Sequence, residues 1–360
     1  MLQLENAPLY ERVQGQLGRQ IEEEYSHGDR FPAERDLMAK MGVSQPTIRR
    51  ALQELVQAGK LRRHVGRGTF VQKFGRSLTT GIVVPLYPSP QIAQELNGYA
   101  KAAERFDCGL RVHYLHEGES VEAVMSRVSA SPELERFVLH GLSPEQAWTL
   151  YEELDKRGFH TLSTIPFEEG YPGNFLFLDP KATVRLCLEH LTGLGHRHIA
   201  VLANEPDELG ETRTRTGLLR EEALRQNVKL GWVNCRTPNW SNSFVSALEH
   251  MPEVMALHPR PTAVVPISGV GAWAALRYAA THGLRVPDDF SVVAFDDLPC
   301  NDLVYPGLTT IKKNYDQAAE RALEILWSNE TTKVRETIQP TIDISESTAP
   351  PTTRTKMPLP

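Results

Sequence analysis

The chain has 360 residues, of which 41% are hydrophobic, so two or three globular domains with buried cores are expected. Its formal net charge of −6 would by itself argue against a nucleic-acid-binding protein. No run of about 18 apolar residues occurs and no signal peptide is recognisable, which predicts a cytoplasmic protein without a membrane span.

Apolar residues recur at helical intervals after residue 33. Residues 34–41 place apolar side chains on one helical face, and Gly42 is expected to end that helix. Ser44 is a good N-cap for a second helix, and Pro46 falls in its first turn, where its missing N–H costs nothing. Gly59 closes this second helix. Its early turns present polar and cationic side chains that would suit a DNA major groove: Ser44, Gln45, Thr47, Arg49 and Arg50.

Two short strands are expected next, over residues 60–64 and 69–71. They surround Gly66-Arg67-Gly68, a hairpin tip at which an arginine flanked by glycines could approach phosphates or a minor groove. The basic charge gathers in this part of the chain. Residues 1–77 contain 13 Lys and Arg against 9 Asp and Glu, so the net charge of −6 divides into +4 for this segment and −10 for the remainder.

Residues 8–71 resemble the winged-helix head of the GntR family of bacterial transcription regulators. The shared marks include Phe31-Pro32-Ala33-Glu34-Arg35, Gly42-Val43-Ser44, Thr47-Ile48-Arg49-Arg50-Ala51-Leu52 and Gly66-Arg67-Gly68-Thr69-Phe70-Val71. The resemblance implies that DNA is contacted by Arg35, Ser44, Thr47 and Arg49 and by the wing at Gly66–Arg67; with their neighbours Gln45, Arg50 and Thr69 these form the predicted DNA-binding set. Family members often carry Arg directly after the serine, where it reads guanine. Here Gln45 follows, and glutamine pairs more naturally with adenine, so a family operator sequence is not transferred.

The pattern changes after a short polar stretch. Residues 1–73 are assigned to the head, 74–80 to a linker, 81–348 to a larger domain and 349–360 to an extended or frayed tail. In the larger domain, continuous apolar strands alternate with helices in two series, from 81 to 165 and from 180 to 327. This pattern predicts an α/β fold with two lobes, each a parallel sheet covered on both faces, and a ligand site at the carboxyl ends of the strands.

This domain resembles the periplasmic-binding-protein-like sensor of LacI-type regulators. The matching runs include Leu191–Ala200, Gly283–Asp297 and Leu308–Ile311, and a GntR-type head on such a domain is the arrangement of arabinose-type repressors. The resemblance and the aromatic residues near its site predict an effector set of Asp296, Arg213 (placed to within a residue or two), Ser268, Tyr87 and Trp240. Trp273 could stack on a ligand or pack in the core, and Asp296 could instead cap a turn. Several polar positions of sugar-binding members are lost, with Leu86, Ile165-Pro166 and Ser268-Gly269 in their place, so the effector is a sugar or a different, less polar metabolite, or sensing has been lost.

The sequence therefore predicts a homodimeric transcription regulator that binds an operator in double-stranded DNA and is controlled by a small molecule. A repressor is expected rather than an activator. Two alternatives remain. One is a Rossmann-like enzyme with a DNA-binding head, suggested by the G-x-G-x-x-A run Gly269–Ala274; this run lies late in the chain and lacks the acidic residue at the end of the next strand. The other is a dimeric DNA binder that senses nothing. We expect no enzyme activity, no cofactor and no metal, since the four cysteines have no metal-binding spacing and His196 and His198 fit a loop that leads into a strand.

Overall fold

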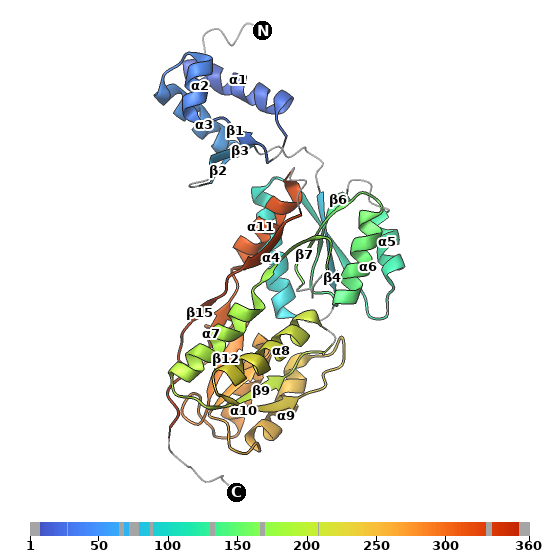
Figure 1. Ribbon diagram of the computed structural model, residues 1–360, viewed down its shortest axis with the longest axis vertical. Helices are drawn as coiled ribbons and strands as arrows, with labels where there is room; N and C mark the ends of the chain where they lie inside the picture. Colours follow the sequence, from blue (N-terminus) through green and yellow to red (C-terminus); the bar gives the residue numbers. More distant parts are fainter. Residues whose placement is uncertain are drawn as a thin grey trace.

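The computed structural model describes residues 8–26, 28–64, 68–71, 79–86, 89–129, 134–165, 170–207, 209–328 and 333–352. The chain forms three tiers: a small head, a first lobe beneath it and a second lobe at the opposite end (Figure 1). We call the lobe that follows the head lobe 1 and the distal one lobe 2.

The head contains three helices and a small sheet. The helices are α1 (Leu9–Glu24), α2 (Glu34–Met41) and α3 (Gln45–Gln57), and the strands are β1 (Arg30–Phe31), β2 (Leu61–His64) and β3 (Gly68–Val71). The sheet is antiparallel in the order β1-β3-β2. Leu17, Leu37 and Leu52, one from each helix, are buried together in its core. Gly42 follows α2 with a φ of 64°, as a left-handed helix end requires. The two predicted helices, α2 and α3, and the hairpin strands are therefore confirmed, whereas α1 and β1 were not predicted.

Lobe 1 is a parallel sheet between two layers of helices. Its strands lie in the order β14-β8-β7-β6-β4-β5, and the pairing is parallel throughout the described ladder. Helices α4 and α11 pack on one face, and α5 and α6 pack on the other. The bounds are β4 (Thr79–Pro85), α4 (Pro90–Arg105), β5 (Gly109–Leu115), α5 (Val121–Ser129), β6 (Leu134–Leu139), α6 (Pro144–Asp155), β7 (His160–Ser163), β8 (Asn174–Leu178), α11 (Tyr315–Trp327) and β14 (Arg335–Ile338).

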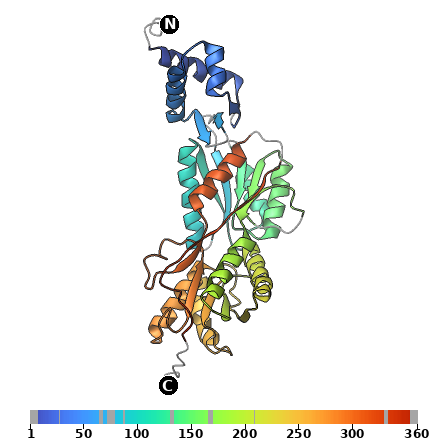
Figure 2. The same ribbon diagram turned by 60° about the vertical axis from the view of Figure 1, so that its left-hand side comes forward.

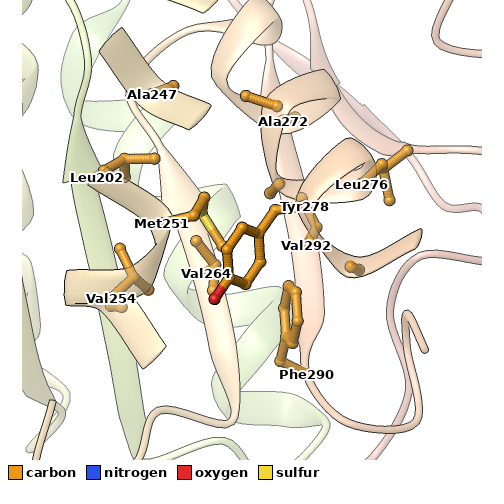
Figure 3. Packing of buried hydrophobic residues seen from close by; sticks show 14 of the residues in the cluster. Leu202, Ala247, Met251, Val254, Val264, Ala272, Leu276, Tyr278, Phe290 and Val292 are labelled. Atoms are coloured by element: carbon orange, nitrogen blue, oxygen red, sulfur yellow. The ribbon is translucent and has the colours of Figure 1, made fainter. Parts of the chain in front are cut away.

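Lobe 2 repeats this design, with strand order β10-β9-β11-β12-β13-β15, in which only the β13–β15 pair is antiparallel among the described strands. Helices α9 and α10 cover one face and α7 and α8 the other. On the first of these faces, Met251 of α9 and Leu276 of α10 pack over Val264 and Val292 of the sheet (Figure 3). The bounds are α7 (Pro180–Gly193), β9 (His198–Ala203), α8 (Gly210–Arg225), β10 (Lys229–Asn234), α9 (Ser243–Met255), β11 (Ala263–Pro266), α10 (Gly269–Thr281), β12 (Ser291–Phe295), β13 (Thr309–Lys312) and β15 (Thr341–Asp343).

The chain crosses between the lobes three times: between β8 and α7, between β13 and α11, and between β14 and β15. Figure 2 shows the last crossing as the red segment that runs diagonally across the front of lobe 1 and down into lobe 2. Helix α11, expected as the last helix of the second series, therefore belongs to lobe 1. That expectation was wrong because an apolar helix stripe shows that a helix is buried without showing which sheet buries it.

Two boundaries also differ from expectation. Strand β4 begins at Thr79, inside the segment assigned to the linker, because Thr80 is fully buried and accepts a hydrogen bond from Trp327 Nε1 at 3.1 Å. At the other end, residues 349–352 are held in place. The carbonyl oxygen of Ala349 accepts hydrogen bonds from the His196 ring and the Ser291 hydroxyl, so this part of the tail is not frayed. Residues 72–78 and 353–360 lie outside the described part of the chain.

Candidate DNA interface and ligand cleft

Helix α3 has one buried and one exposed face. Ile48, Ala51, Leu52 and Leu55 lie in the head core, whereas Gln45, Arg49 and Arg50 are exposed. Ser44 is the N-cap residue by its backbone, yet its hydroxyl bonds to that of Thr47 at 2.9 Å instead of a backbone N–H. The predicted groove-facing side chains therefore share one accessible surface at the start of this helix.

A carboxylate ties this surface to the wing. Glu34 of α2 accepts from Arg49 of α3 at 3.4 Å and from Arg63 of β2 at 2.9 Å. Both guanidinium groups stay largely accessible, so each can exchange this weak surface pair for a DNA phosphate or base. Arg63 was not among the residues predicted to touch DNA.

The other predicted DNA contacts are distributed around this surface. Arg35 is 94% exposed, the Arg50 guanidinium lies 3.8 Å from the centre of the Tyr10 ring, and Thr69 is half-buried on β3. Gly66 and Arg67 at the wing tip lie outside the described residues.

The wing strand also touches lobe 1. Arg62 Nη1 lies 2.7 Å from Glu324 Oε1 and its Nη2 lies 3.4 Å from Glu320 Oε2, both on α11. The same guanidinium lies 5.3 Å from the centre of the Phe106 ring, which follows α4. Arg62 therefore joins the head to the α4–α11 layer of lobe 1.

Between the lobes lies a cleft with three adjoining cavities, at the carboxyl ends of the strands as the fold class predicts. The Trp240 cavity, of about 410 Å³, is lined by Trp240 and Arg213 among others. The Trp273 cavity, of about 490 Å³, is lined by Trp273 and Asp296. A smaller inner cavity of about 70 Å³ shares lining residues with both and also includes Asp296. We call the three together the interlobe cleft.

Asp296 lies at the centre of the cleft. It is 8% exposed, its Oδ2 accepts from the Gly269 N–H at 3.1 Å, and its Oδ1 lies 3.7 Å from Arg215 Nη2. Burial raises the pKa of this carboxyl to about 6, although Arg215 opposes the shift. Asp296 thus holds the first turn of α10 and lines two cavities, so the capping and binding interpretations are compatible.

The remaining predicted effector residues divide between the cavities. Ser268 lines the inner and Trp273 cavities and accepts from Asn204 Nδ2 at 2.7 Å. Arg213 lines the Trp240 cavity and pairs with Glu145 of lobe 1 at 3.2 Å, so it bridges the two lobes. Arg215, two residues later, is the arginine that reaches Asp296. Tyr87 lies outside the described residues.

Sequence reasoning missed a buried charge cluster in the cleft. Glu95 of α4 accepts from His140 Nε2 at 2.5 Å and from Lys313 Nζ at 2.7 Å, and all three side chains are buried. Burial would raise the pKa of the Glu95 carboxyl, but the charges of His140 and Lys313 overcome this effect and lower it to about 2. Lys313 lies on the crossing between β13 and α11, so this cluster joins a crossing segment to the cleft wall. No local signal marks it, since its members lie far apart in the chain.

Glu205, after β9, was missed as well. Its Oε2 accepts from the Ser243 hydroxyl at 2.7 Å, and it lines the inner and Trp273 cavities. Burial, assisted by the charge of Asp296, raises the pKa of its carboxyl to about 7 despite hydrogen bonds from Ser268 and Ser243.

The glycines of the G-x-G-x-x-A run have a packing role. A Cβ on Gly271 would lie 2.6 Å from Pro266 Cβ and 2.7 Å from Asn204 Oδ1, and one on Gly269 would lie 2.8 Å from the Phe295 carbonyl oxygen. The small residues let α10 approach the sheet closely, which accounts for the run without a dinucleotide. His196 is also structural, because both ring nitrogens bond within the protein, to Thr262 and Ala349. In the described part of the chain, no group of three His, Cys, Asp or Glu residues could hold a metal ion, and no helix has the length and apolarity to cross a membrane.

Comparisons with known families divide the chain in the same way. Residues 9–71 match the model of bacterial regulatory proteins of the gntR family, and residues 188–348 match that of the periplasmic binding protein-like domain. The HTH-type transcriptional repressor PurR of Mannheimia succiniciproducens is 31% identical over 156 residues, which are 42% of this chain and 45% of that protein. The chain thus spans less than half the length of this curated relative.

Solved structures agree on the fold. A LacI transcriptional regulator from a Rhodococcus species superposes with a TM-score of 0.66 at 21% identity, over 76% of this chain and 99% of that one. A LacI-family regulator, CCPA from Weissella paramesenteroides with bound glucose, gives 0.65 at 17% identity, over 76% and 99%. All three relatives are named as transcriptional regulators or repressors. The chain therefore joins a gntR-type helix-turn-helix head to a two-lobed, periplasmic-binding-protein-like domain with the fold of LacI-type regulators.

Proposed function

We propose that the protein is a cytoplasmic transcriptional repressor that binds a DNA operator through its head. A small molecule in the interlobe cleft controls this binding. The observation that carries this proposal is the exposed cationic start of α3 beside a wing strand that also carries arginines. The relative named a repressor and the glucose-bound neighbour support the same function.

Selection from random-sequence duplexes with the full chain tests the proposal. We expect enrichment of a pseudo-palindromic sequence, because two heads in a symmetric dimer would meet equal half-sites about one helical turn apart. Affinity for that sequence should fall steeply between 50 and 200 mM salt, on the order of a thousandfold if roughly six phosphates are contacted. Failure to enrich any duplex would refute the proposal.

The dimer is proposed to form through lobe 2. Leu303 and Tyr305, on the loop between β12 and β13, are 82% and 91% exposed, an unusual display of large apolar side chains two positions apart. A second copy of this chain would cover them in a symmetric contact.

We expect the Tyr305→Asp variant to be monomeric at micromolar concentration, because a carboxylate placed in an apolar contact loses hydration without gaining a partner. Light scattering after gel filtration measures the mass. The matched control is Leu224→Asp on α8, where a leucine that is 82% exposed is replaced and the dimer should persist. A dimeric Tyr305→Asp protein would place the interface elsewhere.

Communication between cleft and head is proposed to pass through α11. This helix begins two residues after Lys313, which lies in the cleft cluster, and it holds Arg62 of the wing strand through Glu320 and Glu324. A ligand that moves one lobe against the other would shift α11 and change how the heads are held.

A double-mutant cycle tests this route. Arg62→Ala and Glu324→Gln are each expected to change operator affinity by a few-fold. The double variant should match Arg62→Ala, since that change already removes the partly exposed pair with Glu324, worth about 0.5–1 kcal/mol, together with the contact to Glu320. Fluorescence anisotropy with the selected operator measures each affinity. Strictly additive effects would show that Arg62 acts on DNA directly and that the contact with α11 has no regulatory role.

A further inference from the structure

The lining of the Trp273 cavity combines carboxylates and aromatic rings without a basic side chain among its described residues. It includes the carboxylates of Glu205 and Asp296 and the rings of Phe244 and Trp273, while none of its described lining residues is Lys, Arg or His. A cavity with two carboxylates and two aromatic rings offers ion pairing and cation–π attraction to a positive group.

Glu205 has no described ion-pair partner. Its described hydrogen-bond partners are neutral: the Ser243 hydroxyl at 2.7 Å, the Asn204 amide at 3.4 Å and the Ser268 hydroxyl, and no described cation lies within salt-bridge distance of it. The raised pKa of its carboxyl has the same origin, because burial and the nearby charge of Asp296 both disfavour ionisation.

The nearest guanidinium, that of Arg215, offsets the charge of the two carboxylates only in part. Arg215 lines the inner cavity, where its Nη1 donates to the carbonyl oxygen of Ile267 and its guanidinium lies 4.6 Å from the centre of the Phe295 ring. Its distance of 3.7 Å to Asp296 is long for an ion pair, and it makes no described contact with Glu205.

Helix ends do not supply the missing charge either. The N-termini of α4, α9 and α10 face this cavity and carry partial positive charge. Each is already capped by the protein itself, through Ser89, Asn242 and Asp296, which accept from the backbone N–H groups of Ile92, Phe244 and Gly269. An anion would compete with these caps and meet two carboxylates.

We infer that the effector carries a cationic nitrogen, an ammonium or quaternary ammonium group, that binds between Glu205 and Asp296 in the Trp273 cavity and against the rings of Phe244 and Trp273. Regulation of DNA binding by this ligand rests on the proposed function, whereas binding itself does not. If the effector is such a cation, neutral sugars should bind the cleft more weakly than it does.

Matched pairs of compounds test the inference on the full chain. Each pair differs in the positive charge: choline against 3,3-dimethylbutan-1-ol, glucosamine against glucose, and putrescine against butane-1,4-diol. We expect at least one amine to raise the Tm and to bind at least 10-fold more tightly by calorimetry than its neutral counterpart. Equal or stronger binding of the neutral compounds, or no binding by any amine, overturns the inference.

A variant at Glu205 locates the site. Glu205→Gln keeps an oxygen for the Ser243 hydroxyl but removes the charge, so it should fold and lose at least 10-fold in affinity for the amine. Glu249→Gln on α9 is the matched control, since Glu249 is exposed and does not line the cavity, and it should bind like the unmodified protein. Unchanged affinity in Glu205→Gln would remove this residue from the site.

The pH dependence gives a further readout. The groups that face Glu205 are Asp296, Arg215 and the hydroxyls of Ser243 and Ser268. Because the carboxyl ionises with a pKa of about 7, a quaternary ammonium that binds it should bind more tightly at pH 8 than at pH 6, and Glu205→Gln should reduce that difference. These measurements need no DNA, so amine binding without operator binding would refute the proposed function alone, and the reverse would refute this inference alone.

Discussion

Arg49→Ala is expected to weaken operator binding by about 1–3 kcal/mol, or roughly 10- to 150-fold, while the fold is retained. Arg49 lies on the exposed face of α3, and its pair with Glu34 is a surface interaction worth about 1 kcal/mol or less. Removing the side chain therefore costs the head little stability but takes one cationic contact from the DNA surface.

Fluorescence anisotropy at several salt concentrations measures this effect and its origin. If Arg49 contacts a phosphate, the slope of log K against log salt should fall by about one; if it reads a base, the discrimination between operator and random duplex should fall instead. Arg260→Ala is the control, because Arg260 is exposed on lobe 2 far along the chain from the head. An Arg49→Ala protein with full affinity and specificity would exclude α3 as the helix that reads DNA.

Glu95→Ala is expected to lower the free energy of unfolding by about 3–5 kcal/mol, the largest stability loss we anticipate for a single substitution. It would leave Lys313 buried without its carboxylate and remove the acceptor of the His140 ring. Urea denaturation followed by circular dichroism measures the loss. Glu95→Leu combined with Lys313→Met is the matched control, since removing both charges should restore most of the stability.

The pH dependence of this effect has a defined sign. The pKa of Glu95 is lowered in the folded state from 4.5 to about 2, so its ionised form stabilises the fold above about pH 4.5 and that contribution is lost as the pH falls toward 2. The difference between the unmodified protein and Glu95→Gln should therefore be full at pH 6 and small at pH 2. A Glu95→Ala protein within about 1 kcal/mol of the original at pH 6 would show that the cluster does not stabilise the lobes.

The head could be predicted closely from sequence because its signals are local. The apolar spacing of α3, the serine before it and the glycine after α2 each act within a few residues, and the structure confirms the helices they predict. The strands β8, β10, β13, β14 and β15 were not predicted. They are short, and β10 and β15 have few fully buried positions, so their apolar pattern is weak.

The cleft was harder to predict for a geometric reason. Arg213 and Arg215 are two residues apart on α8, and side chains at such positions point to different sides of a helix. Arg213 pairs with Glu145 of lobe 1, whereas Arg215 contacts Asp296. An alignment that is uncertain by two residues therefore cannot tell which arginine reaches Asp296. Glu205 follows a buried strand without any motif. No pattern in the sequence shows that the Glu205 carboxylate has no ion-pair partner, because the residues around it belong to other helices and strands.

The sequence by itself determined the winged head, the basic charge on that head and the alternation that builds two parallel sheets, because each depends on neighbours within one or two helical turns. Only the tertiary structure decided that α11 belongs to lobe 1, that Glu95 pairs with His140 and Lys313, and that Arg62 joins the wing to that lobe. These contacts link residues as many as 262 positions apart, from Arg62 to Glu324, and their energies depend on distance and burial in space, which spacing along the chain does not encode.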